Sequence, residues 1–387
     1  MKICLLGASG SIGKQTIDVI RKNEGDFSLT SFSVGSRTRC ISSIIKHHPE
    51  VKHICVQHRD SFNYYQKKYP QITFYYGDNG LLELIKHSDS EMVVNALVGF
   101  VGLLPSIEAI KNHKLLALAN KESLVVGGEI INSLLKEYNG KLYPIDSEHS
   151  ALWKCLKVDS NDVDKLILTA SGGAFRKLTR DQLEDVKARD ALKHPTWKMG
   201  NKITIDCATM VNKAFEIIEA GYLFNYPISR IGVTLHDESY LHSYVSLKSG
   251  GFRGEISKPD MRNPIKFALY QGNILFKTSY FASLDDLKGL HFHSFDINRY
   301  PVIKYAETVL SKKGNTGAIF NRANEVAVHA YLKDEIKFLD IEKIIAYSMK
   351  HIRYVKKPTV DQILNTDRLT RKYAESLVKE IKGGKQL

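Results

Sequence analysis

The sequence predicts an α/β protein that opens with a doubly wound parallel sheet. Apolar segments of strand length alternate with helix-like segments over residues 1–120. A glycine-rich turn joins the first strand to the first helix, and polar residues directly follow a later strand. Alternation of this kind indicates parallel pairing, because a parallel connection needs a crossover that is usually a helix. At 387 residues the chain has room for two or three domains.

The first strand, residues 2–7, runs into the glycine-rich turn. Gly7, Gly10 and Gly13 follow the spacing G-x-x-G-x-x-G, a variant of the dinucleotide fingerprint. These glycines permit a tight turn and let a pyrophosphate approach the backbone at a helix N-terminus. The turn therefore predicts a Rossmann-like nucleotide site, and a structural turn without a ligand is the alternative.

The second strand, Leu29 to Val34, ends in positive charge. NAD enzymes usually carry Asp or Glu at this point to hold the ribose 2′-hydroxyl. This chain has Gly35, Ser36 and Arg37 instead, with Arg39 close behind. Because a 2′-phosphate is negative, this composition favours NADPH over NADH.

The alternation continues through strands at 54–56, 92–96 and 115–119, with a helix at 60–68. Asn120, Lys121 and Glu122 directly follow the last of these strands. Open parallel sheets bind ligands at the carboxyl ends of their strands. The alternative is a helix N-terminus capped by Asn120, which explains Lys121 least.

Asp146 and Glu148 lie two residues apart after a short extended segment at 140–143. In an extended chain, side chains two apart point to the same side. Two close carboxylates repel unless positive charge lies between them, and hard cations such as Mg²⁺ or Mn²⁺ suit such oxygen-rich positions. A solvated turn is the alternative.

Ser171, with Gly172 and Gly173, follows a predicted strand at 166–169. A hydroxyl and free backbone N–H groups in such a turn can bind phosphate, although a plain tight turn is equally consistent. Thr179 then predicts the start of a polar helix over 180–192.

Residues 194–200 contain Trp197 between Pro195 and Gly200. A large apolar side chain in a short polar loop is typical of a lid, and a buried structural tryptophan is the alternative. A strand at 203–206 and a helix at 207–221 are predicted next.

That helix carries Asn212, Lys213 and Glu216 on one polar face. The alternative function of this face is a surface Lys213–Glu216 pair, which would stabilise the helix by only ~0.3–0.5 kcal/mol.

Composition narrows the class of protein. The net charge is +13, but the Lys and Arg residues are spread along the chain without a basic-aromatic platform, so we expect no nucleic-acid partner. The longest apolar run, residues 92–104, is too short for a bilayer. Because the first predicted strand begins at residue 2, we expect no signal peptide. Five scattered cysteines without a C-x-x-C pair predict reduced thiols and a cytoplasmic location.

Together these motifs resemble one family, the 1-deoxy-D-xylulose 5-phosphate reductoisomerases of the methylerythritol phosphate route to isoprenoids. The matching strings occur in the family's order over residues 1–332: GASGSIG, LANKESLV, PIDSEHSA, TASGGAF, HPTWKMG, IDCATMVNKAFEIIEA, PDMRNPI and NEVAVHAYL.

The resemblance implies an enzyme that uses NADPH and a divalent metal to rearrange and reduce 1-deoxy-D-xylulose 5-phosphate to 2-C-methyl-D-erythritol 4-phosphate. It implies a homodimer whose subunit has a Rossmann-like NADPH domain, a central α/β catalytic domain and a C-terminal helical domain. The implied boundaries are 1–150 for the NADPH domain, 151–275 for the catalytic and dimerisation domain with a mobile lid, 276–297 for a connecting segment and 298–387 for the helical domain. Amphipathic patterns at 340–350 and 367–381 agree with helices in the last of these.

Site residues carried over from the family fall into four groups. The resemblance implies Mn²⁺ or Mg²⁺, with Co²⁺ a further candidate, on Asp146, Glu148 and Glu216. The catalytic residues would be Lys121, Glu148 and Glu216. The substrate-binding residues would be Lys121, Ser147, Glu148, Ser171, His194, Cys207, Asn212, Lys213 and Glu216. The NADPH-binding residues would be Ser9, Gly10, Ser11, Ile12, Gly35, Ser36, Arg37, Asn120, Glu122 and Gly200.

The chain departs from the family pattern at four places. Cys207 stands where Ser is usual, and a thiol is a weaker donor to phosphate. Ser36 and Arg37 replace the usual Lys-Asn, residues 235–243 lack the usual Pro-Gln, and residues 271–273 lack an expected Tyr-Pro. None of these changes a predicted metal ligand or Lys121, so we expect activity to survive.

Two other functions compete with this interpretation. An NADPH-dependent dehydrogenase without rearrangement, such as a semialdehyde dehydrogenase, would need a catalytic cysteine, and Cys155 and Cys207 lack a convincing histidine partner in the sequence. A basic, non-enzymatic binding protein would leave Asp146, Glu148 and Glu216 unexplained.

Overall fold

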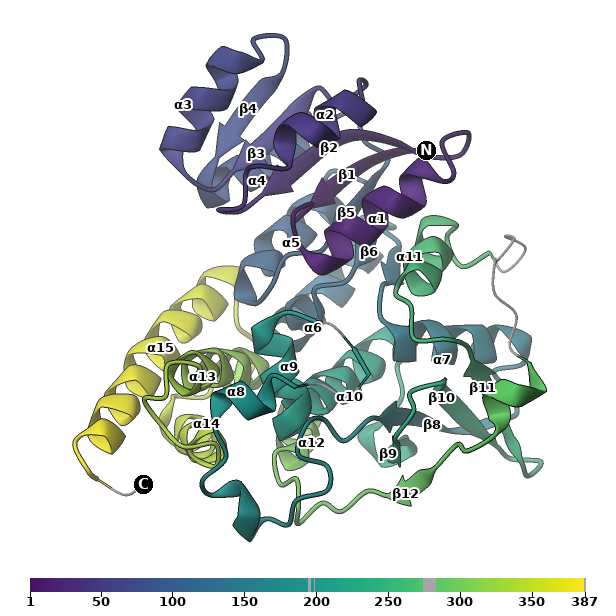
Figure 1. Cartoon of the computed structure of the whole chain (residues 1–387), viewed down its shortest axis with the longest axis vertical. Helices are drawn as coiled ribbons and strands as arrows, with labels where there is room; N and C mark the ends of the chain where they lie inside the picture. Colours follow the sequence, from purple (N-terminus) through teal and green to yellow (C-terminus); the bar gives the residue numbers. More distant parts are fainter. Residues whose placement is uncertain (194–195, 198, 274–282, 386–387) are drawn as a thin grey trace. The chain divides into compact units, whose positions relative to one another are not determined.

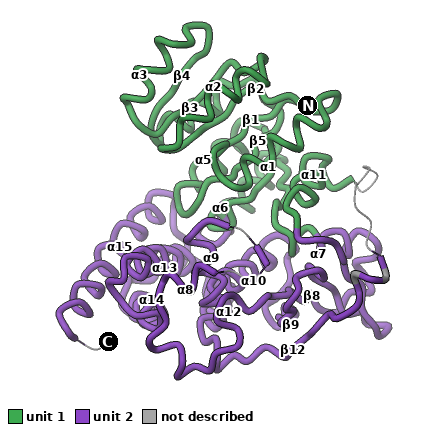
Figure 2. Tube along the Cα trace, viewed as in Figure 1, with its two compact units in different colours: residues 1–123, 131–150, 260–277 green, residues 124–130, 151–259, 278–387 purple. Residues whose placement is uncertain are grey.

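The structure is a computed structural model that describes residues 1–193, 196–197, 199–273 and 283–385. The chain divides into two compact units, each assembled from separate stretches of sequence (Figure 2). Unit 1 comprises residues 1–123, 131–150 and 260–277, and unit 2 comprises residues 124–130, 151–259 and 278–387. The domain boundaries given above stay a prediction.

Unit 1 is built on a seven-stranded parallel sheet with the order β4-β3-β2-β1-β5-β6-β7 (Figure 1). Its strands are β1 (Lys2–Leu6), β2 (Ser28–Val34), β3 (His53–Val56), β4 (Thr73–Tyr76), β5 (Met92–Asn95), β6 (Leu115–Leu118) and β7 (Leu142–Pro144). The chain winds outward from β1 to β4, returns to β5 beside β1 and continues outward to β7. The strand order thus reverses between β1 and β5, which confirms the doubly wound parallel sheet.

The helices of unit 1 connect successive strands. They are α1 (Ser11–Arg21), α2 (Ile41–His47), α3 (Arg59–Lys68), α4 (Gly77–His87), η1 (Phe100–Gly102) and α5 (Leu103–Lys111). Unit 1 also contains α11 (Arg262–Leu269), which comes from a later stretch of the chain and connects no strands of this sheet. Two further helices, α6 (Lys121–Glu137) and α7 (Ser147–Val158), contain residues of both units.

The central strands form because their residues are apolar on both faces. Ile3, Cys4, Leu5 and Leu6 of β1 are all fully buried, as expected for a parallel sheet covered on two sides. Helix α1 packs so close to the glycine-rich turn that a Cβ on Gly13 would lie 2.3 Å from the Gly7 carbonyl oxygen. Glycine at position 13 is therefore a packing requirement of this fold.

Unit 2 contains a five-stranded mixed sheet with the order β11-β10-β8-β9-β12. Its strands are β8 (Val163–Ala170), β9 (Ile231–His236), β10 (Leu241–Leu247), β11 (Phe252–Ile256) and β12 (Phe292–Ser294). β8 and β9 are parallel, and the other pairs are antiparallel. The remaining elements are η2 (Asp181–Leu183), α8 (Ala188–Ala191), α9 (Asn201–Thr209), α10 (Val211–Phe224), η3 (Ile228–Arg230), η4 (Leu284–Leu287), α12 (Ile303–Lys312), α13 (Thr316–Tyr331), α14 (Asp340–His351) and α15 (Val360–Lys382).

Helix α13 is the buried centre of the helical part of unit 2, with α9, α12, α14 and α15 packed against it. Helix α15 begins with a capping box in which Thr359 and Gln362 bond to each other's backbone N–H groups. Both C-terminal helices expected from the sequence are confirmed, and α15 starts at Val360, before the predicted range. Within the described ranges, no helix is both long and apolar enough to cross a membrane.

Two local predictions in unit 2 are wrong. Residues 203–206, predicted as a strand, belong to helix α9, because Ile205 and Ala208 lie one helical turn apart and are both buried. Packing overrides the strand preference of the β-branched residues there. The polar helix predicted over 180–192 is only the short elements η2 and α8, since its apolar residues lack the helical stripe that would bury one continuous face.

Replacing Arg322 by alanine should lower the free energy of unfolding by about 3–5 kcal/mol, because it removes one partner of a buried ion pair. Arg322 of α13 donates to Asp367 of α15 at 2.5 Å, and both residues are buried. Arg368→Ala, at an exposed position on α15, is the control and should change stability by no more than about 0.5 kcal/mol. Chemical denaturation measures both, and equal effects would contradict the importance of the buried pair.

Candidate functional site

The glycine-rich turn of unit 1 presents a helix N-terminus at the carboxyl end of β1. The Gly10 N–H donates to the Gly7 carbonyl at 2.9 Å, and Gly10 itself is the N-cap of α1 with no side-chain cap. Ser9 is buried in the turn, Ser11 is exposed, and Ile12 follows in the first turn of the helix. Backbone N–H groups at such a terminus bind anions, so the turn fits a dinucleotide pyrophosphate.

Asn120 fixes two segments at the carboxyl ends of β5 and β6. Its Oδ1 accepts from the Ser123 N–H at 3.1 Å, so Asn120 caps α6 as the alternative interpretation stated. Its Nδ2 donates to the Leu97 and Gly99 carbonyls at 3.0 and 2.9 Å and to Glu122 at 3.2 Å. A single buried side chain therefore shapes the loop after β5 and the start of α6.

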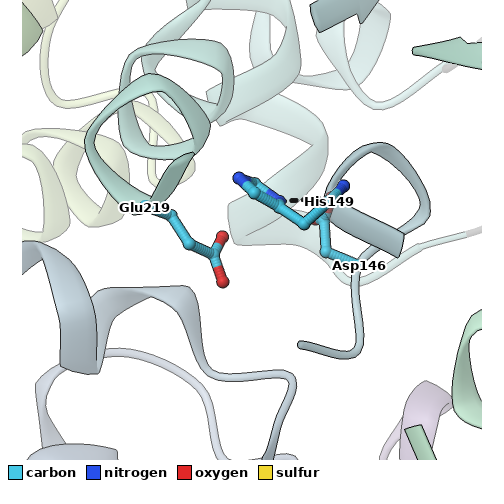
Figure 3. Close-up of side chains that lie close together, drawn as sticks. All are labelled: Asp146, His149 and Glu219. Carbon is cyan, nitrogen blue, oxygen red and sulfur yellow. Dashed lines mark hydrogen bonds and ion pairs between the residues drawn. The ribbon is translucent and has the colours of Figure 1, made fainter. Parts of the chain in front are cut away.

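Asp146 is the N-cap of α7 and is surrounded by donors. Lys121 Nζ lies 2.9 Å from Oδ2. His149 Nδ1 lies 2.8 Å from Oδ1, a contact drawn in Figure 3. The backbone N–H groups of Glu148 and His149 also donate to Oδ1, at 3.0 and 3.2 Å. The extended conformation predicted for Asp146 and Glu148 is therefore wrong, because the capping carboxylate starts a helix at Ser147.

The charge state of Asp146 follows from these neighbours. Burial raises the pKa of the carboxyl, but the charges and hydrogen bonds of Lys121 and His149 outweigh burial and hold the pKa well below its usual range. Asp146 is thus ionised over the range in which proteins are stable, which is the state that a metal ligand requires.

His149 and Glu219 received no role from the sequence. Two overlapping sets of side chains in the described part of the chain could hold a metal ion: Asp146, Glu148 and Glu216, or Asp146, His149 and Glu219. Figure 3 draws the second set. The signal for His149 is the D-x-x-H spacing, which places two side chains on one face of a helix but was hidden by the extended interpretation. For Glu219 the signal is the E-x-x-E spacing from Glu216.

In unit 2, the first turns of α10 carry a buried polar group. Lys213 and Glu216 form an ion pair, and Asn212 Nδ2 donates to Glu216 Oε1 at 2.5 Å. The side chains of Lys213 and Glu216 are only 5% and 2% exposed, so a surface pair is excluded. Burying two charges costs several kcal/mol per ion, and such a pair is weak evidence for stability.

A sharp bend separates α9 from α10. The helix predicted over 207–221 is two helices, because Met210 adopts a left-handed conformation with φ of 65°. Thr209 Oγ1 accepts from the Val211 N–H at 3.3 Å and supports the start of α10. Cys207 and Asn212 therefore lie on two separate helices, α9 and α10, on either side of the bend at Met210.

The turn after β8 packs directly on this bend. A Cβ on Gly173 would lie 2.7 Å from Ala208 Cα and 2.8 Å from the Cys207 carbonyl oxygen, and Gly173 has a φ of +67°. Ser171 Oγ accepts from the Gly173 N–H at 3.3 Å. Unit 2 therefore places the turn that carries Ser171 against α9 at Cys207.

Helix α13 packs against α9 and is hydrogen-bonded to it. Asn324 Nδ2 donates to Asp206 Oδ1 at 2.8 Å, and Lys202 Nζ lies 2.9 Å from Asp206 Oδ2. Asn324 and Asp206 are both buried. The matched string NEVAVHAYL thus contributes a contact that fixes the helix carrying Cys207.

The predicted lid is only partly described. His194, Pro195 and Lys198 lie outside the described residues, so the assignment of His194 to substrate binding stays a prediction. The Trp197 ring centroid lies 6.4 Å from that of His242. Gly200 is the N-cap of α9.

The fold and these groups define a dinucleotide-binding α/β enzyme with buried, lysine-paired carboxylates. Three protein-family models match the chain: "1-deoxy-D-xylulose 5-phosphate reductoisomerase" over residues 3–128, "1-deoxy-D-xylulose 5-phosphate reductoisomerase C-terminal domain" over 142–224, and "DXP reductoisomerase C-terminal domain" over 256–373. The chain belongs to the 1-deoxy-D-xylulose 5-phosphate reductoisomerase family.

Individual relatives agree over nearly the whole length. The chain is 41% identical over 374 residues to 1-deoxy-D-xylulose 5-phosphate reductoisomerase 2 of Bacillus thuringiensis subsp. konkukian, covering 96% of this chain and 98% of that one. A crystal structure of DOX-P reductoisomerase in complex with NADPH, fosmidomycin and magnesium superposes with a TM-score of 0.92 at 31% identity and 99% coverage of both chains. The Zymomonas mobilis enzyme in complex with NADPH gives 0.89 at 30% identity, covering 97% of this chain and 98% of that one.

Gly173→Ala should lower the free energy of unfolding by about 1–3 kcal/mol, because the new Cβ meets backbone atoms of α9 and the left-handed backbone strains any other residue. Gly25→Ala is the matched control, since a Cβ there meets nothing within 4 Å. Thermal and chemical denaturation compare the two variants. Unchanged stability in Gly173→Ala would refute the close approach of the turn to α9.

Proposed function

We propose that this chain converts 1-deoxy-D-xylulose 5-phosphate to 2-C-methyl-D-erythritol 4-phosphate in the non-mevalonate isoprenoid pathway, with NADPH and one divalent metal ion. The observation that carries the proposal is identity of 41% to a named reductoisomerase over 96% of this chain. The solved relatives contain NADPH, magnesium and the phosphonate fosmidomycin, which supports these cofactors and a phosphorylated substrate.

NADPH would bind at the carboxyl edge of the unit 1 sheet. The glycine turn with its exposed helix N-terminus supports a pyrophosphate position, and the exposed residues after β2 support the adenosine end. The residues proposed to hold it are Ser9, Gly10, Ser11, Ile12, Gly35, Ser36, Arg37, Asn120, Glu122 and Gly200.

The metal ion would be held by Asp146, Glu148 and Glu216. These carboxylates are one of the two sets that could hold an ion, and an all-oxygen set suits Mg²⁺ or Mn²⁺, with Co²⁺ a further candidate. The low pKa of Asp146 supports its role as an anionic ligand. When bound, NADPH supplies the hydride that reduces the rearranged aldehyde, and the metal supplies a Lewis acid and template for the substrate oxygens.

The remaining residues would bind and orient the substrate. Ser171, Cys207, Asn212 and Lys213, with His194, would hold the phosphate, far from the carbons that react. Binding energy gained there can be used to orient the reacting end while the C3–C4 bond is broken and a new bond is formed between C4 and C2. Lys121 and Ser147 would contact the substrate oxygens, with Lys121 placed to stabilise developing negative charge.

The oligomer and location are also proposals. We propose a homodimer on the basis of the family resemblance, and Phe252, which is 74% exposed on the edge strand β11, is an apolar group that such an interface would cover. A cytoplasmic location is supported by the five cysteines, all of which are free thiols.

The environments of Cys155 and Cys207 argue against the alternative function, a dehydrogenase with a catalytic cysteine. Burial raises the pKa of Cys155 to about 11, so this thiol is poorly suited to act as a nucleophile. Cys207 packs at the turn that carries Ser171, which supports a binding role. The carbon skeleton of the product separates the two functions.

Loss of NADPH absorbance should require both 1-deoxy-D-xylulose 5-phosphate and a divalent ion. Turnover with Mn²⁺ or Mg²⁺ should vanish with EDTA and return when the ion is restored. Glu216→Gln should lower metal-dependent turnover by at least about 100-fold, because a neutral amide is a poor ligand for a hard cation.

Glu137→Gln, at an exposed position on α6, is the matched control and should retain activity. No turnover in any metal from well-folded protein would reject the proposed reaction. A reduced product with an unbranched carbon skeleton would show that the protein is a dehydrogenase that does not rearrange its substrate.

A further inference from the structure

NADPH differs from NADH only by its 2′-phosphate, so the residues that distinguish the two cofactors have to contact that group. The segment after β2, residues 35–39, contains no carboxylate to hold a 2′-hydroxyl and carries Arg37 and Arg39. Positive charge alone attracts any anion, including the pyrophosphate that both cofactors share. Discrimination needs a donor aimed at one position.

The register of two strands brings such a donor to this segment. β2 and β3 are parallel neighbours, and Val34 is paired with Val56 at their carboxyl ends. Ser36 and His58 each lie two residues beyond that pair. Ser36 Oγ and His58 Nε2 are 3.1 Å apart, so a hydroxyl and an imidazole from different strands form one hydrogen-bonded group.

This group lies in a positive and accessible environment. Ser36, Arg37 and His58 are exposed, as is Arg59, which follows His58 at the start of α3. The nearby carboxylate of Asp78 accepts from Gln57 Nε2 at 3.4 Å. An incoming phosphate would thus meet a hydroxyl, an imidazole and guanidinium groups together.

We propose that His58, oriented by Ser36, is a specificity-determining residue that binds the 2′-phosphate of NADPH together with Arg37. The inference rests on the proposed use of NADPH. In this arrangement the Ser36 hydroxyl donates its single proton to Nε2, so that Nδ1 carries the imidazole proton and donates to the phosphate. Sequence reasoning missed His58 because it follows the next strand, β3, and is brought near Ser36 only by the register of β2 and β3.

Binding measurements test this without turnover. Fluorescence titration of the full-length protein with NADPH and NADH gives the two dissociation constants, and 2′,5′-ADP and ADP serve as competitors that lack nicotinamide. His58→Ala should weaken NADPH and 2′,5′-ADP by about tenfold, the loss expected for a charge-assisted hydrogen bond, and leave NADH and ADP unchanged. His58→Lys should restore most of the NADPH affinity, because the lysine ammonium supplies an N–H donor in place of the imidazole.

His87→Ala is the matched control. His87 is exposed at the C-terminal end of α4, which leads back to the amino ends of the strands, so neither cofactor should be affected. Equal weakening of NADPH and NADH in His58→Ala would overturn the inference in favour of a structural role, and unchanged NADPH affinity would overturn it outright. A wild-type protein that binds NADH as tightly as NADPH would instead refute the proposed cofactor.

Discussion

Two of the three proposed metal ligands, Asp146 and Glu216, are buried carboxylates with partners within hydrogen-bonding distance. In unit 1, Asp146 has Lys121 and His149; in unit 2, Glu216 has Lys213 and Asn212. Without such partners, burial would drive these groups to their neutral forms and remove their value as ligands. The partners come from helix starts, which explains why polar residues gather at the first turns of α6, α7 and α10.

The strands of unit 1 could be predicted from the sequence because both faces of its sheet are buried. In β5, for example, all four residues are buried and the first three, Met92, Val93 and Val94, are apolar, so the strand is apolar on both faces of the sheet. The failures occurred where packing decides between two conformations. Residues 203–205 are all β-branched, and the segment is nevertheless helical because Ile205 and Ala208 are buried one turn apart and Asp206 bonds to Asn324 of α13. The αL residue Met210, which splits one predicted helix into two, leaves no mark in composition.

The site residues stay a prediction, and the local conformation predicted for two of them was wrong. The family resemblance supplied Asp146, Glu148 and Glu216, but local reasoning assigned the first two to an extended chain. Their real setting is the cap and first turn of α7. His149, one residue further on, contacts Asp146 only because the chain is helical at that point. Because Asp146 and Glu148 were predicted in an extended chain and not at the start of a helix, the contact between His149 and Asp146 was not predicted.

The two oxygens of Asp146 do different work. Oδ1 accepts two backbone N–H groups and His149, and it holds the start of α7; Oδ2 accepts only from Lys121 among the bonds described above. Oδ1 therefore has a structural role at the start of α7. Oδ2 can exchange the Lys121 ammonium for a metal ion without loss of the bonds that cap the helix. Asparagine could preserve the first task but would direct a neutral group at Lys121, and glutamate would overreach the cap. Of these three side chains, only aspartate can both cap α7 through Oδ1 and present a charged Oδ2 to a cation.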